Sequence, residues 1–434
     1  MLAINRPPGM ILNVLAGTST IEPGGIYMFL NSVAVSVTLL VGIMLFHRRL
    51  RHSEQWRATV TPLASIIGSG FLIVAPLLHS VMGKWALLGM VGLSVFAYAL
   101  GWVIRFNITN AEPYLEKHPT GIVYRFEQAA QWSLGIAYAI SVAFYISLFT
   151  AFIFDRFGLS DPMTGKWVTT GLLLSIMAIA WLRGAKGLEW IELIAVTIKL
   201  AIILGVLAAL LSFDIVEGAA WFQHEAITEL SLIQTTAMLA GMLMVTQGFE
   251  TARFMGGQYN PEQRINAVIY SQGIAITLYV IFIGLTCPIF LTFPITELNE
   301  TTISHTLGKA VWVLPFLLLI AATASQLSAA LADTIGGGGL LKELVRWRLS
   351  NNIYYMLIIV LALFLVWSAN VFEIINLASK GFALYYLIQV LIAISLVWKL
   401  PRNGVLIWPR VVLMGVLGIG LVFVIGWSIP APHS

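Results

Sequence analysis

The sequence predicts an all-α polytopic membrane protein with about twelve transmembrane helices. Hydrophobic residues make up 59% of its 434 residues and charged residues only 10%, which is too apolar for a soluble globular protein. The apolar runs are long and lack the alternation of apolar and polar residues typical of a lipid-facing β-strand. Helices are therefore the remaining structure that can satisfy the hydrogen-bonding groups of the backbone in a bilayer. With a single cysteine, Cys287, no internal disulfide or thiolate metal site can form, and we expect no cofactor and no bound metal.

The expected helices follow one another with short connections. Residues 1–25 contain prolines and no basic region before the first apolar run, so we do not expect a cleaved signal peptide. Two connections are longer, Arg105 to Ala130 and Asp214 to Glu229, and the second could form an outer cap helix. The twelve apolar segments are Tyr27 to Phe46, Thr59 to Leu78, Trp85 to Ile104, Gln131 to Phe154, Trp167 to Leu182, Leu188 to Phe213, Leu230 to Phe254, Ala267 to Phe293, Leu307 to Ala332, Ile353 to Trp367, Val371 to Trp398, and Val405 to Ile425.

The basic residues predict the orientation of these segments. Placing the loop from Arg48 to Arg57 in the cytoplasm puts most of the 24 lysines and arginines on the cytoplasmic side, as the positive-inside rule requires. Both termini then lie outside, and we expect a multi-pass protein of a bacterial inner membrane. The net charge of +4 follows from this bias, so the sequence indicates a lipid environment and no nucleic-acid partner.

Glycines interrupt two of the apolar segments. Gly68 and Gly70 weaken the second segment at its middle, and Gly248 weakens the seventh, five segments later and in the opposite direction through the membrane. Each break alone is explained almost as well by close helix packing. Two interrupted helices at corresponding places in two five-helix halves favour an inverted-repeat transporter, in which the unwound backbone binds a ligand.

The residues around both breaks resemble those of the amino acid–polyamine–organocation superfamily, which has the leucine-transporter fold. The run from Ile66 to Phe71 is similar to its first-helix motif, and Gly248 to Thr251 followed by Tyr259 to Arg264 is similar to its sixth-helix motif. Thr120-Gly121 and Asn376 to Ser379 continue the resemblance. It implies a ten-helix 5+5 inverted repeat with discontinuous first and sixth core helices over residues 57–399, plus one extra helix within residues 1–56 and another within residues 400–434.

The resemblance also implies a substrate site at the breaks. The N–H groups freed at Gly68, Ser69 and Gly70 would bind a substrate carboxylate, helped by the positive end of the following half-helix. Carbonyl groups freed around Thr246 and Gln247 would bind an α-amino group. The expected substrate-binding residues are Ile67, Gly68, Ser69, Gly70, Thr246, Gln247, Gly248 and Phe249.

Lys199 is a lysine near the centre of an apolar segment. Its ammonium is too far from either end to reach the membrane surface easily and should face protein or water. In sodium-independent members of the family, a matching lysine stands where other members bind sodium. We therefore expect Lys199 to donate to carbonyl groups near Ser65 to Gly68 and to Ser325 or Ser328, with burial tuning its charge so that protons could couple to transport.

Glu250 and Lys380 are two further ionisable residues that we expect to act in coupling or gating. Glu250 follows the second break, where the family often has a glutamate that senses protons or orders the inner gate. Lys380 is unusual for the family, and it could pair with Glu250 or Glu373 or contact an anionic group of the substrate. The family arginine near the end of the eighth core helix is absent, because Ala332-Asp333-Thr334 stands there, and Met244 occupies the aromatic gate position.

The sequence therefore favours a secondary active transporter for an amino acid or related amine, sodium-independent and compatible with proton coupling or exchange. Two alternatives remain, a transporter-like sensor or scaffold subunit and a membrane-embedded enzyme. An enzyme would need clustered histidines or acids, but the seven histidines are expected in loops or at segment ends. The side chain of the substrate, any protein partner and the oligomeric state are not predicted.

Overall fold

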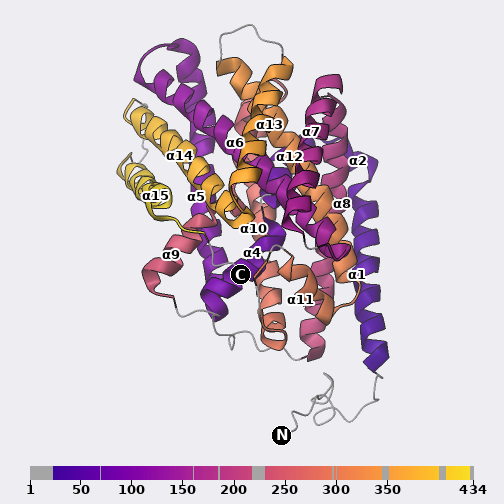
Figure 1. Ribbon diagram of the computed structural model, residues 1–434. Helices are drawn as coiled ribbons and strands as arrows, with labels where there is room; N and C mark the ends of the chain where they lie inside the picture. The colour runs from indigo at the N-terminus through magenta and orange to yellow at the C-terminus, as the bar shows by residue number, and fades with distance from the viewer. Residues whose placement is uncertain are drawn as a thin grey trace.

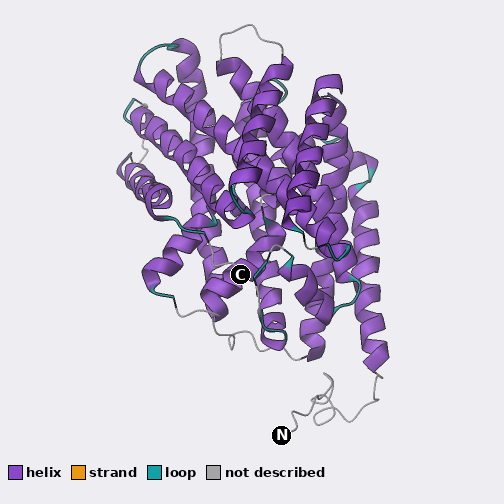
Figure 2. Cartoon of the chain, viewed as in Figure 1, coloured by secondary structure: helices purple, strands orange, loops and turns teal. Residues whose placement is uncertain are grey.

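A computed structural model describes residues 23–68, 70–159, 161–183, 186–217, 230–295, 298–299, 301–344, 351–399 and 407–430. Throughout these residues the regular structure is helical, as Figure 2 shows. Eight of the described helices are long and apolar enough to cross a membrane, and two shorter apolar helices cover Leu232–Gly241 and Ile353–Ser368. Eleven of the twelve predicted segments correspond to one helix or one interrupted helix, and the other, Leu307 to Ala332, covers parts of two helices; this confirms an all-α polytopic membrane protein.

Two five-helix halves form the core, and each begins with an interrupted helix (Figure 1). The first half contains α3 (Glu54–Gly68) with α4 (Phe71–Met82), then α5 (Ala86–Lys117), α6 (Ile122–Arg156), α7 (Pro162–Arg183) and α8 (Lys186–Glu217). The second half contains α9 (Leu232–Gly241) with the short 3-10 helices η3 (Leu243–Thr246) and η4 (Phe249–Met255), then α10 (Pro261–Thr292), α12 (Leu314–Leu344), α13 (Asn351–Ser368) and α14 (Val371–Val397). The remaining elements are α1 (Pro23–Leu45), α2 (Arg48–Arg51), η2 (Gly83–Trp85), α11 (Thr302–Ala310) and α15 (Ile407–Trp427).

The two extra helices pack on opposite parts of the core. α1 lies along α8, where a Cβ on Gly205 would come within 2.6 Å of the carbonyl oxygen of Ala34, so glycine permits this close approach. α15 packs against α14, and the two helices lie side by side in Figure 1. Within the core, α6 packs against both α12 and α14 and forms the wall opposite the first break.

Helix starts follow local capping chemistry. Asn260 accepts a hydrogen bond from the Gln263 N–H at 2.8 Å, and the Gln263 side chain accepts one from the Asn260 N–H at 3.1 Å, with Pro261 in the first turn. The same reciprocal capping by Asn370 and Glu373 starts α14. The stretch that resembles the sixth-helix motif thus includes the start of α10.

Three expected boundaries were wrong. The connection from Arg105 to Ala130 is largely helical, since α5 extends to Lys117 and α6 begins at Ile122. The segment from Leu307 to Ala332 is divided, because Val311 adopts an extended conformation after α11 and Pro315 fits only the first turn of the next helix. In the outer connection α8 continues to Glu217, and the rest of the expected cap lies outside the described residues.

Candidate functional site

The first break separates α3 from α4. Gly68 ends α3 and would place a Cβ 2.7 Å from the Cβ of Ala329 on α12, so only glycine lets the two helices approach this closely. Gly70 has a φ of 145°, a backbone conformation that favours glycine, and precedes the free N-terminus of α4. Ser69, an expected ligand of the substrate carboxylate, lies outside the described residues.

The second break lies directly against the first. Gln247 is extended and Gly248 has a φ of 126°, so the chain leaves helical geometry between η3 and η4. A Cβ on Gly248 would lie 2.6 Å from the backbone nitrogen of Ile66, which requires glycine at this contact. The structure therefore brings the two predicted interruptions into contact at one place.

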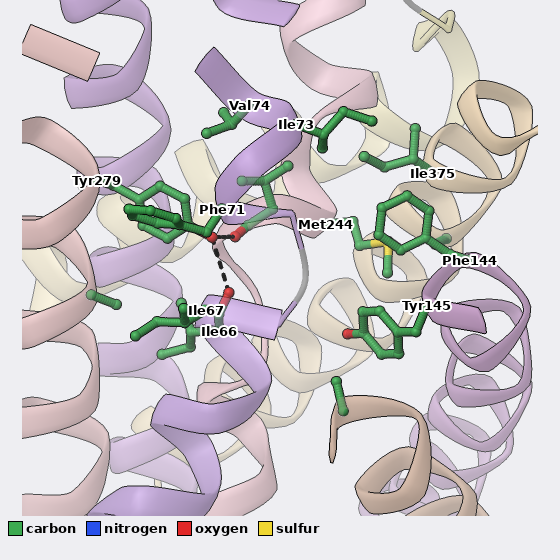
Figure 3. Close-up of a cluster of buried hydrophobic side chains, with 14 of the residues drawn as sticks. Ile66, Ile67, Phe71, Ile73, Val74, Phe144, Tyr145, Met244, Tyr279 and Ile375 are labelled. Atoms are coloured by element: carbon green, nitrogen blue, oxygen red, sulfur yellow. Dashed lines mark hydrogen bonds between the residues drawn. The ribbon is translucent and has the colours of Figure 1, made fainter. Parts of the chain in front are cut away.

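Tyr279 of α10 links the two breaks. Its hydroxyl lies 3.0 Å from the carbonyl oxygen of Ile66 and 2.9 Å from that of Val245, so it can donate to either of these buried backbone groups at the two breaks (Figure 3). Tyr279 also contacts the ring of Phe71, with centroids 5.1 Å apart. Tyr279 is not among the residues predicted from the sequence, and its hydroxyl in the middle of an apolar helix is the signal that could have identified it.

Polar side chains around the breaks are buried and partly unpaired. Within the described part of the chain, the Ser65 hydroxyl and both amide atoms of Gln247 have no hydrogen-bond partner. Figure 3 shows the hydroxyl of Tyr145 directed toward the interval between Ile67 and Phe71. Buried polar groups are normally satisfied, so this cluster is typical of a place where a polar ligand binds.

Lys199 of α8 is fully buried and bridges two other helices. Its ammonium donates to the carbonyl oxygen of Ala64 on α3 at 2.8 Å and to the hydroxyl of Ser325 on α12 at 3.4 Å. Ala64 is one residue before the expected range of carbonyl groups. The hydroxyl of Ser328 donates to the carbonyl of Ser325 at 2.9 Å. A positive charge thus lies where α3, α8 and α12 meet, immediately before the first break.

Glu250 is fully buried and holds the second break in place. Its Oε2 atom accepts hydrogen bonds from the Gly248 N–H at 2.8 Å and from the Tyr386 hydroxyl at 2.6 Å. The ring of Phe249 stacks on that of Tyr386, with centroids 5.3 Å apart. Protonation of this carboxylate would therefore change the contact between the sixth core helix and α14.

Among the described residues, Lys380 makes no ion pair with the other expected coupling residues. It is half-buried on α14, and no described ion pair joins it to Glu250 or to Glu373, whose carboxylate instead caps α14. Its neighbour Ser379 faces the second break, accepting from the Met244 N–H at 2.9 Å. Of the two adjacent residues, Ser379 is therefore the one that the structure places at the candidate site.

A cavity of about 730 Å³ leads from the α2 side toward the breaks. We call the side that carries α2 the basic side, which the sequence predicts to be cytoplasmic. Arg48 and Arg57 line the outer part of the cavity, and Ser65 of α3, Tyr138 of α6 and Asp333 of α12 line its buried part. The site is thus reached from the basic side in this conformation.

Buried charges beside the cavity join several helices. They were not predicted from the sequence, because Arg253 was used only as an indicator of topology and Arg264 also as part of the family resemblance. Arg253 of η4 donates to Glu127 of α6 at 2.9 Å and to the side chain of Gln389 on α14. Arg264 of α10 pairs with Glu112 of α5 at 2.6 Å and donates to the Arg253 carbonyl at 2.8 Å. The segment after the second break is thereby anchored to both halves of the core.

His79 lies in the last turn of α4, at a segment end as expected. It is fully buried there and lies 3.4 Å from the hydroxyl of Thr286. Among the described residues, no group of three or more histidine, cysteine or acidic side chains could hold a metal ion. His79 therefore belongs to a small polar contact between α4 and α10.

Two interrupted helices in an inverted repeat, with their breaks in contact at the end of a cavity, define a secondary transporter. The family model for APC superfamily transporters matches residues 48–428, and the chain belongs to that superfamily, as a transporter and not an enzyme. An uncharacterized protein of Aquifex aeolicus (strain VF5) is 40% identical over 338 residues, covering 77% of this chain and 82% of that protein. The substrate-bound outward-open structure of a Na+-coupled sialic acid symporter has a TM-score of 0.52 and 13% identity, covering 94% of this chain and 99% of that one, which shows a shared fold.

Proposed function

We propose that the protein is a sodium-independent transporter of an amino acid or related amine. The observation that carries the proposal is the ammonium of Lys199, 2.8 Å from the Ala64 carbonyl and 3.4 Å from the Ser325 hydroxyl. Oxygen ligands of this kind suit a small cation. When protonated, a built-in ammonium supplies that charge, so the contact between α3 and α12 needs no bound sodium ion.

The two breaks offer complementary groups for a zwitterion. The N-terminus of α4 presents free N–H groups and a positive dipole end to a carboxylate. Residues Thr246 to Gly248 present unwound backbone to an amino group. Their contact, together with the unpaired amide of Gln247, supports binding of an amino acid between them, with residues 57–399 as the transport core.

Transport would proceed by alternating access, with the interrupted helices moving against α6, α12 and α13. Glu250 supports coupling to protons, because it accepts from both the Gly248 N–H and the Tyr386 hydroxyl. Neutralising it would weaken the tie between the sixth core helix and α14. This arrangement is compatible both with proton-coupled uptake and with exchange of one substrate for another.

The test is a thermal-shift screen of the purified chain against amino acids and amines, with and without sodium and at two pH values, followed by uptake into proteoliposomes. Ligands that bind the folded state raise its melting temperature, by an amount that grows with the logarithm of ligand concentration relative to Kd. We expect stabilisation and uptake that do not depend on sodium, and loss of uptake in Lys199→Ala. A sodium requirement, or a Lys199→Ala variant with full uptake and an unchanged pH response, would contradict the proposal.

Lys199→Arg serves as the matched variant, since it retains the charge but changes the shape of the head group. If Lys199→Ala fails to fold, sodium dependence of wild-type uptake still decides the question. The absence of any shift with amino compounds would favour a sensor or scaffold subunit.

A further inference from the structure

An apolar groove lies on the outer face of the helix bundle, where α5, α10 and α15 meet. It has a volume of about 470 Å³ and shares no described lining residue with the cavity that leads to the breaks. Its walls are mostly aliphatic and aromatic, with Val91 and Val95 on α5, Val280 on α10 and Leu413 on α15. Val95 is 66% exposed, so this surface faces the surroundings of the bundle.

Arg105 lines one end of this groove and is the one charged residue among the described residues that line it. It follows Trp85 by 20 residues, which corresponds to about 30 Å along the axis of α5 and to the thickness of the hydrocarbon core of a bilayer. Trp85 is exposed at the other end of this span, and tryptophan is enriched at membrane interfaces. Arg105 therefore lies at the depth of the lipid head groups on the basic side.

Two contacts hold the guanidinium of Arg105 against the groove. It lies 4.9 Å from the centroid of the Tyr98 ring, and Tyr98 is seven residues earlier on α5, toward the interior of the membrane. It also donates to the side-chain oxygen of Gln272 on α10 at 3.3 Å. Gln272 is fixed in turn, because its amide donates to the Ala97 carbonyl at 2.8 Å. The charge is thus positioned at the end of the groove.

The charge of Arg105 has no acidic partner among the described residues, whose ion pairs join Arg253, Arg264 and His305 to acids elsewhere. The ring of Tyr98 and the oxygen of Gln272 engage only part of a guanidinium that has five N–H donors. A charge at this depth is costly without an anion. A planar guanidinium matches a phosphate group in particular, which it binds through two parallel hydrogen bonds.

We propose that this groove binds an anionic phospholipid of the basic-side leaflet, with the phosphate at Arg105 and an acyl chain along α5. From Arg105 to Val91 the groove follows 14 residues of α5, or about 21 Å. Half of the hydrocarbon core is about 15 Å thick, so the groove has room for a chain of one leaflet. The lipid then fills the space between the core and the extra helix α15. This inference does not depend on the proposed function.

A second surface groove offers an internal comparison. It has a volume of about 540 Å³ between α3 and α10, and its described lining residues include no lysine, arginine or acid. Tyr270 lines it and is 50% exposed, much as Tyr98 of the first groove is 43% exposed. Apolar volume and an exposed tyrosine are therefore common to both grooves. The charge of Arg105 distinguishes the first groove and selects an anionic lipid for it.

The experiment compares two phospholipids that differ in net charge. Native mass spectrometry of the purified full chain measures the binding of phosphatidylglycerol and of phosphatidylethanolamine with the same acyl chains. We expect wild type to bind phosphatidylglycerol about fivefold or more tightly, which is the attraction that one arginine near the membrane surface supplies. Arg105→Gln should remove this preference. Arg105→Lys should retain part of it, because the ammonium keeps the charge without the planar fork.

Matched variants separate the groove from the rest of the basic surface. Arg49→Gln should behave as wild type, because Arg49 is an exposed arginine of α2 that lines neither groove. Ala99→Phe fills the first groove and should weaken binding of both lipids. Ile269→Phe makes a similar change in the second groove and should leave phosphatidylglycerol binding unchanged. If Arg105→Gln does not fold, the wild-type comparison and Ala99→Phe decide the question.

Three results would overturn the inference. Equal affinity of wild type for the two lipids would remove the anionic preference. Equal losses in Arg49→Gln and Arg105→Gln would assign the preference to the general excess of basic residues on this side. Unchanged binding in Ala99→Phe would place the acyl chain elsewhere. None of these measurements involves a transported substrate, so each leaves the proposed function intact.

Discussion

The hydroxyl of Tyr279 lies 3.0 Å from the carbonyl oxygen of Ile66, at the end of the first half-helix. The same hydroxyl is 2.9 Å from the carbonyl oxygen of Val245 in the second interrupted helix. A hydroxyl has one proton, so it donates to one carbonyl at a time and can exchange between them. Tyr279 thus provides a shared and switchable contact for the two segments that we propose to move during transport.

Replacing Tyr279 with phenylalanine should lower stability without leaving a large cavity. The change removes the donor and leaves buried carbonyl groups less satisfied, a loss of about 1–3 kcal/mol. We expect a lower melting temperature in detergent and a larger change in the transport rate than in substrate affinity. Tyr270→Phe on the same helix is the control, because Tyr270 is 50% exposed. Equal melting temperatures for both variants would contradict the prediction.

Gly248→Ala should prevent the two breaks from meeting. The φ of 126° is strained for alanine, at about 1–3 kcal/mol, and the added Cβ would clash with the Ile66 nitrogen at 2.6 Å. We expect loss of substrate binding and a marked fall in melting temperature. Gly257→Ala, at a glycine with open space around it, should have little effect on either measurement. Normal binding by Gly248→Ala would show that the contact is dispensable.

Both breaks could be predicted from the sequence because the effect of glycine is local. It disfavours the interior of a helix and permits close approach of a neighbouring backbone. Lys199 was also visible from the sequence, because a lysine in an apolar run needs a partner wherever that partner lies. Tyr279 and Arg253 were missed for the opposite reason. A tyrosine in a helix is ordinarily packed in the core, and an arginine at a segment end ordinarily marks topology, so tertiary contacts were needed to distinguish their roles from these ordinary ones.

The buried pair of Arg253 and Glu127 should contribute far more to stability than the exposed pair of Asp155 and His305. Removing one partner of a buried pair costs up to about 3–5 kcal/mol, and without Glu127 the ion-pair partner left to Arg253 among the described residues is Glu112, at the longer distance of 3.9 Å. Glu127→Gln should therefore lower the melting temperature strongly, and adding Arg253→Met should restore much of the loss. Asp155→Asn breaks a pair with His305, whose side chain is 61% exposed, and should cost less than about 1 kcal/mol. Similar effects of the two single changes would refute this ranking.

Lys380→Met gives the sharpest comparison with Lys199, since both are lysines within apolar helices. Lys380 is half-buried, is absent from the ion pairs of the described residues, and neighbours Ser379, which already makes the contact to the second break. Methionine matches its length and removes the need to hydrate an ammonium at this depth. We expect unchanged or increased melting temperature with wild-type uptake, whereas Lys199→Met should abolish uptake. If Lys380→Met lost uptake or its pH response, Lys380 would take part in coupling. That result would also imply that α14 reorients during the transport cycle.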